Sequence, residues 1–71
     1  MDNYEEIIKH ITLRIKTLRI EKGLSIQELA YRCDMERSNL SRLEAGRTNM
    51  TIKTLTIICN ALEINIRELF R

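Results

Sequence analysis

The sequence predicts an all-α fold, a compact domain of five helices. The chain has 71 residues, of which 44% are hydrophobic and only 4% aromatic, so its core must be aliphatic. It contains no proline and two glycines, which leaves little of the turn chemistry that β-hairpins use. Apolar residues recur at helical spacings of three and four along the chain. We expect a single domain over residues 1–71.

The first helix is expected over residues 4–22. Asp2 or Asn3 can cap its start, and Gly23 follows its end in the position of a C′ glycine. Five apolar residues share one face of this helix and are the expected core residues: Ile7, Ile8, Ile11, Ile15 and Leu18.

Two short helices joined by a tight turn are expected next, over about residues 25–46. Ser25 and Glu28 have the spacing of a capping box, which predicts a helix start. Asp34 tolerates the left-handed conformation that a tight turn often needs. The second of the two helices is expected over about residues 36–45. This arrangement is typical of a helix-turn-helix.

Two further helices complete the expected fold. Thr51 caps a fourth helix over about residues 52–62, and Asn65 caps a short fifth helix, "IRELFR". The core face of the fourth helix is expected to hold Ile52, Leu55, Ile58, Cys59 and Leu62. We expect no effector domain.

Several classes of function are disfavoured by the composition. Cys33 and Cys59 fall at apolar helical positions, so we expect buried, reduced thiols and neither a disulfide nor a metal site. With one histidine and no glycine-rich phosphate loop, we expect no enzyme activity and no cofactor. No signal peptide and no stretch of transmembrane length is visible, so we expect a cytoplasmic protein that binds no membrane.

The segment from Ile11 to Phe70 resembles the Cro/Xre-type, lambda-repressor-like helix-turn-helix domains of phage and bacterial repressors. The motifs that carry the resemblance are "LRIEKGLS", "ELA", "SNLSRLEAGR" and "ALEINIRELF". The resemblance implies a five-helix fold that binds a palindromic operator as a homodimer. Residues 36–45 would be the recognition helix, which enters the major groove of double-stranded DNA. It implies no small-molecule ligand.

The polar face of the recognition helix supplies the expected DNA contacts. If Leu40 and Leu43 point inward, the outward side chains project together and read base edges. These base-reading residues are Arg37, Ser38, Ser41 and Arg42. The resemblance implies phosphate contacts by three other positions, in part through backbone N–H groups: Asn39, Gly46 and Arg47. A solvated polar face with no ligand is the alternative interpretation.

The resemblance also implies an ion pair between Arg19 and Glu44 that joins the first and third helices; two unrelated surface charges are the alternative. Four positions depart from the family pattern: Met50 replaces a common proline, Glu63 replaces a common glycine, and the other two bear on DNA binding. Ile26 stands where many members have a glutamine that contacts a phosphate. Glu36 stands where many have a serine or threonine cap, and it is a poor N-cap.

Some apolar residues do not fit the expected core faces. We expect Ile57, Ile64 and Ile66 to form the dimer interface. Leu13 and Ile20 lie on the opposite side of the first helix. The predicted function is a sequence-specific transcriptional regulator, and the direction of regulation stays open. The alternative is an antitoxin or another interaction module that neutralises a partner protein through Leu13, Ile20 and the N-terminal ten residues.

Overall fold

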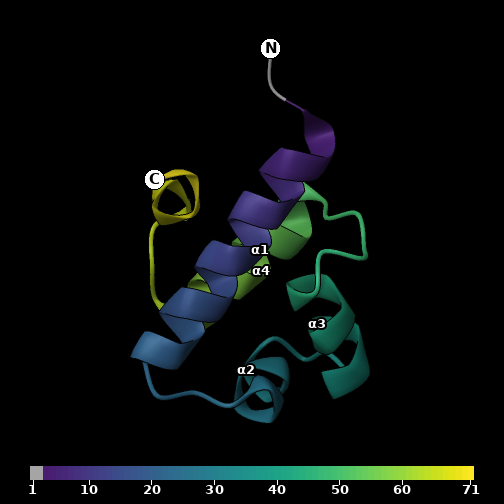
Figure 1. Ribbon diagram of the computed structural model, residues 1–71. Coiled ribbons are helices and arrows are strands. Elements are labelled where there is room, and N and C mark those ends of the chain that lie inside the picture. The colour runs from purple at the N-terminus through teal and green to yellow at the C-terminus, as the bar shows by residue number, and fades with distance from the viewer. Residues whose placement is uncertain (1–2) are drawn as a thin grey trace.

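The computed structural model describes residues 3–71 and confirms the all-α fold (Figure 1). In Figure 1, α1 runs through the middle of the molecule, with α3 on one side and the C-terminal segment on the other. The structure has four α-helices and one 3-10 helix, in the order α1 Tyr4–Glu21, α2 Ile26–Arg32, α3 Arg37–Glu44, α4 Ile52–Leu62 and η1 Ile66–Phe70. The expected short fifth helix is present as the 3-10 helix η1, since short helical segments often adopt the tighter 3-10 geometry.

The first helix begins and ends at the predicted signals. The side chain of Asn3 accepts hydrogen bonds from the amides of Glu5 and Glu6, whereas Asp2 lies outside the described residues. Gly23 follows the C-cap residue Lys22 and adopts a φ of +70°, which is the left-handed conformation that a C′ glycine supplies.

The predicted core face of α1 is correct only from its middle onward. Ile11, Ile15 and Leu18 are buried, but Ile7 is 38% exposed and Ile8 is only half-buried. The first turns of α1 lie at the end of the molecule, where fewer elements cover them (Figure 1). Ile7 and Ile8 therefore have the spacing of core residues, but no other element packs over them completely.

The helix-turn-helix segment, from the cap of α2 to the turn before α3, follows the sequence signals closely. The Ser25 hydroxyl accepts from the Glu28 amide at 3.0 Å, and the Glu28 carboxylate accepts from the Ser25 amide at 3.0 Å. This amide lowers the pKa of the Glu28 carboxyl below its ordinary value. Asp34 has a φ of 55°, as a left-handed turn residue. Ala30 is buried, which leaves room for α3 to cross α2 closely.

The last two elements close the core. Four of the five predicted core residues of α4 are buried: Leu55, Ile58, Cys59 and Leu62. The fifth, Ile52, is 69% exposed, because it lies in the first turn of α4 beyond the packed part of the helix. In η1, Leu69 is fully buried while Phe70 is exposed.

Cys33 and Cys59 are both buried, which confirms their predicted place in the core. Burial raises the pKa of the Cys33 and Cys59 thiols and disfavours their reactive thiolate forms. Among residues 3–71, no helix is both long and apolar enough to cross a membrane. The same residues contain no group of three or more metal-binding side chains gathered at one place.

Candidate nucleic-acid interface

Helix α3, which covers most of the predicted recognition helix, presents its polar residues to solvent. Leu40 and Leu43 are buried, as predicted. Arg37, Ser38 and Arg42 are exposed on the other side of α3, whereas Ser41 is half-buried. Of the four predicted base-reading residues, Ser41 is thus the least accessible.

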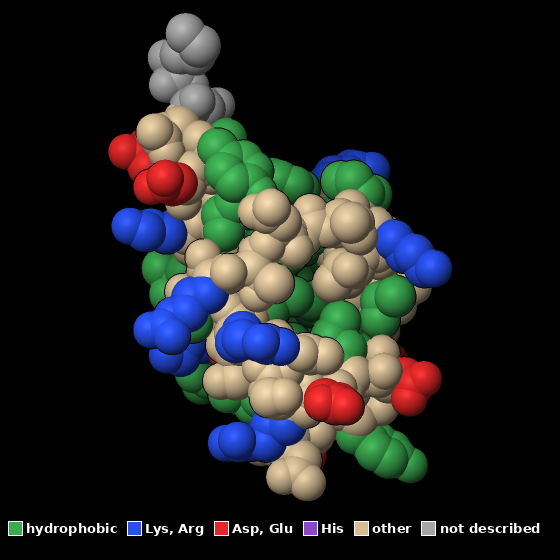
Figure 2. All heavy atoms as spheres, turned by 90° about the vertical axis from the view of Figure 1, so that its right-hand side faces the viewer, with side chains coloured by type: hydrophobic (Ala, Val, Ile, Leu, Met, Phe, Trp, Pro, Cys, Tyr) green, Lys and Arg blue, Asp and Glu red, His purple; other side chains and the backbone are tan. Residues whose placement is uncertain are grey.

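The face that carries α3 is shown in Figure 2. Lysine and arginine side chains spread over it, separated by neutral polar groups, and acidic side chains lie toward its upper left and lower right. Such a surface attracts a polyanion without being a continuous basic patch, which agrees with a formal net charge of only +2.

Asn39 and Arg42 lie one helical turn apart and contact each other. The Arg42 guanidinium donates a hydrogen bond through Nη2 to Asn39 Oδ1. This contact restricts the orientation of the exposed Arg42 side chain, while the amide nitrogen of Asn39 stays available as a donor. The structure therefore joins a predicted base-reading residue to a predicted phosphate-binding residue.

The backbone after α3 corrects one expectation. The Gly46 amide donates to the Leu43 carbonyl at 3.0 Å, and the Arg47 amide donates to the Arg42 carbonyl at 3.1 Å. Both N–H groups close the end of α3, so they are not free to bind phosphate. Gly46 has a φ of +74°, which explains the glycine there. The exposed Arg47 side chain remains a candidate for a phosphate contact.

Arg19 and Glu44 form an ion pair that fixes α3 against α1. Arg19 Nε lies 2.8 Å from Glu44 Oε2, and Nη2 lies 3.2 Å from Oε1. The third nitrogen, Nη1, donates to the Leu24 carbonyl at 2.7 Å. The two side chains are only 9% and 5% exposed. The pair is a buried, bidentate connection that holds α3 in a fixed orientation against α1.

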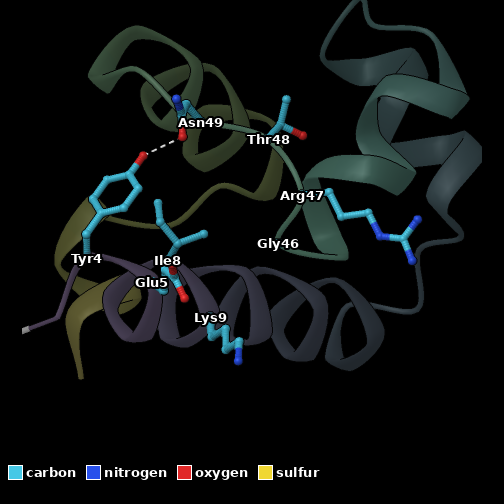
Figure 3. Close-up of a pocket in the computed structure, with 8 residues that line it drawn as sticks. All are labelled: Tyr4, Glu5, Ile8, Lys9, Gly46, Arg47, Thr48 and Asn49. Atoms are coloured by element: carbon cyan, nitrogen blue, oxygen red, sulfur yellow. Dashed lines mark hydrogen bonds between the residues drawn. The ribbon is translucent and has the colours of Figure 1, made fainter.

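Sequence reasoning missed one contact of this region. The Tyr4 hydroxyl donates to Asn49 Oδ1 at 2.6 Å, across 45 residues of sequence (Figure 3). Figure 3 also shows Arg47 pointing away from the hollow between α1 and the loop after α3. No local pattern signals a contact between residues so far apart in the chain.

Glu36 and Ile26 depart from the family pattern in the way the sequence predicts. Glu36 is the N-cap of α3 but makes no side-chain capping hydrogen bond. Ile26 packs partly against the core, so it offers no polar group for a phosphate at the start of α2.

Replacing Glu36 with serine should therefore improve both folding and DNA binding. A serine hydroxyl can accept from a free amide in the first turn of α3, which we expect to stabilise the domain by about 0.5–1 kcal/mol. Loss of the carboxylate beside Arg37 should also tighten DNA binding about threefold at low salt. Thermal unfolding and fluorescence anisotropy with a labelled duplex measure the two effects.

Glu21→Ser is the matched control for Glu36→Ser. It also removes one exposed carboxylate, at the last residue of α1. Equal gains in affinity from the two substitutions would show that only net charge matters and would contradict a local effect at α3.

Residues 15–69 match the model of a helix-turn-helix family, HTH_3. The chain belongs to this family of Cro/Xre-type DNA-binding transcriptional regulators. A helix-turn-helix regulator of Sinorhizobium fredii, y4dJ, is 42% identical over 52 residues, which cover 73% of this chain and 68% of y4dJ. The regulator DdrOP3 of Deinococcus deserti is 34% identical over 56 residues, which cover 79% of this chain and 43% of DdrOP3.

Solved structures of helix-turn-helix regulators have the same fold. The restriction-modification controller protein C.AhdI from Aeromonas hydrophila superposes with a TM-score of 0.85 at 34% identity. That alignment covers 94% of this chain and all of C.AhdI. The chain spans about half the length of other curated helix-turn-helix relatives: 43% of DdrOP3, and 55% and 53% of two Rickettsia regulators.

Proposed function

We propose that this helix-turn-helix protein is a sequence-specific regulator that binds a palindromic operator as a homodimer. One observation carries the proposal: α3 buries Leu40 and Leu43 and exposes Arg37, Ser38 and Arg42 on one ridge. This ridge fits the major groove, where base edges are distinguishable. The regulator acts by occupying a promoter site, with no chemical step.

Each exposed residue has a defined part in the proposed complex. The guanidinium groups of Arg37 and Arg42 pair with O6 and N7 of guanine, and the serine hydroxyls contact either kind of base edge. The amide nitrogen of Asn39 and the guanidinium of Arg47 bind phosphates and fix the register of α3.

The proposed dimer interface contains Ile57, Ile64 and Ile66. All three are half-buried and pack partly against the core, so each leaves some apolar surface uncovered. They lie on α4, η1 and the connection between them. A two-fold axis beside these residues would match the two-fold symmetry of a palindromic operator.

Similarity to controller proteins favours a restriction-modification operon as the regulated target. C.AhdI is one such relative, and the control protein C.BamHI of Bacillus amyloliquefaciens is 28% identical over 57 residues. We expect the regulator to respond to its own concentration, which needs no small-molecule ligand.

Selection of bound duplexes from a random pool tests the proposed function. We expect a palindromic motif, and sedimentation of the complex should give two chains per duplex. Ile57→Ala, Ile64→Ala and Ile66→Ala should weaken binding to the palindrome more than Leu13→Ala, which removes an exposed apolar side chain elsewhere. A pool that returns no motif, or a complex with one chain per palindrome, would contradict the proposal.

A second candidate function is an antitoxin that binds a partner protein. Leu13 and Ile20 are 62% and 57% exposed, and both lie on α1. Contiguous exposed apolar patches mark protein interaction sites, and these two side chains would belong to such a patch in this function. Co-expression with the product of the neighbouring gene tests it: relief of growth arrest that Leu13→Asp abolishes would favour this function.

A further inference from the structure

We propose that Tyr4 is a positioning residue of the DNA interface. Its hydroxyl orients the Asn49 side chain so that the Asn49 amide nitrogen is presented to a DNA phosphate beside Arg42. The inference rests on the proposed DNA binding and assigns a part in it to the first turn of α1.

The geometry of the hydrogen bond fixes the direction of the amide. Asn49 Oδ1 accepts from the Tyr4 hydroxyl at 2.6 Å, so the Nδ2 group lies on the opposite side of the side chain. Figure 3 shows this nitrogen directed away from Tyr4. Nδ2 carries two N–H donors, which suit a phosphate oxygen.

Asn49 lies between two hollows on the surface. One hollow separates the first turns of α1 from the loop after α3 and includes Tyr4 (Figure 3). The other lies against α3 and is lined by two apolar side chains, four neutral polar ones and one cation, Arg42. Among the described residues, its lining is Met35, Asn39, Arg42, Leu43, Thr48, Asn49 and Thr54. This lining has donors and a positive charge but no carboxylate, so it favours an anion.

The loop that holds Asn49 has backbone or capping hydrogen bonds at its two ends and one hydrogen bond from its middle to α1. The end of α3 fixes the start of the loop, and the Thr51 cap of α4 fixes its end. Within residues 3–71, the amides of Thr48 and Asn49 donate to no backbone acceptor. The hydrogen bond from Tyr4 therefore supplies the polar contact between this part of the loop and α1.

Tyr4→Phe tests the inference, because it removes the hydroxyl and keeps the ring. We expect DNA binding to weaken about threefold to tenfold, the range of one hydrogen bond. The loss should be equal on the selected duplex and on a random-sequence duplex, since a phosphate contact carries no sequence information. The salt dependence should not change, because a neutral amide displaces no counterion.

Tyr31→Phe is the matched control. Tyr31 is 83% exposed on α2, and we expect its hydroxyl to be dispensable. A double-mutant cycle with Asn49→Ala separates positioning from general stability: Tyr4→Phe should have no further effect on DNA affinity once Asn49 is absent. Thermal unfolding of Tyr4→Phe should stay close to that of the unmodified protein.

The outcomes separate this inference from the proposed function. A loss of less than about twofold in Tyr4→Phe, or a loss that persists in the Asn49→Ala background, would overturn the positioning role. If no motif is selected but Tyr4→Phe still weakens binding to the random duplex, sequence-specific regulation fails and the phosphate contact stands.

Discussion

Replacing Arg42 with alanine should weaken binding to the selected operator by about 1–3 kcal/mol, or roughly fivefold to 150-fold. Arg42 is exposed on α3, and Asn39 holds its guanidinium before any DNA is bound. A side chain that is already oriented loses less conformational entropy on binding, so its contact with guanine should be strong. Arg37→Ala should have an effect of the same kind at a neighbouring base pair.

The pattern of loss across sequences distinguishes base reading from charge. A repeated selection with Arg42→Ala should return a motif whose preference is relaxed at one position of each half-site. Arg42→Lys keeps the charge but loses the bidentate fork, so it should resemble the alanine variant in specificity. Arg67→Ala, an exposed arginine of η1, is the control for net charge. A uniform loss on all duplexes, with a salt slope reduced by about one, would identify Arg42 as a phosphate contact instead.

Replacing Glu44 with alanine should destabilise the domain by about 3–5 kcal/mol, because Arg19 would stay buried without a counter-charge. The Leu24 carbonyl would be its remaining partner in the site. Domains have only about 5–15 kcal/mol of stability in total, so much of the protein would unfold at physiological temperature. For a small domain this loss corresponds to a fall in Tm of about 12 °C or more. Arg19→Ala should have a comparable effect on thermal unfolding.

Two variants test the reason for the loss. Arg14→Ala breaks a half-exposed pair with Glu68, whose closest charged atoms are 3.7 Å apart, and should cost about 1 kcal/mol. The double variant Arg19→Met, Glu44→Leu replaces the buried pair with apolar side chains and should regain most of the lost stability. Equal losses in Arg14→Ala and Glu44→Ala, or no recovery in the double variant, would contradict an uncompensated buried charge.

The sequence predicted where the helices start and which face of α3 is buried, because those signals are local. Ser25 and Glu28 are three residues apart, and one helical turn brings them into hydrogen-bonding contact in any fold. The burial of Leu40 and Leu43 follows from spacing in the same way, and it predicted which face of α3 is exposed. The Arg19–Glu44 pair, separated by 25 residues, was expected only from the family resemblance.

Only the tertiary structure decided where each packed face stops and which distant groups meet. Ile7 and Ile52 have core spacing but are exposed, because spacing identifies a face of a helix and not the length that its neighbours cover. The Gly46 amide is already used at the end of α3, and Tyr4 reaches Asn49 across the fold. The sequence by itself thus determined the helices and their exposed faces. Which polar groups remain free to bind DNA was decided by packing, because a hydrogen bond between distant residues depends on the positions of whole elements.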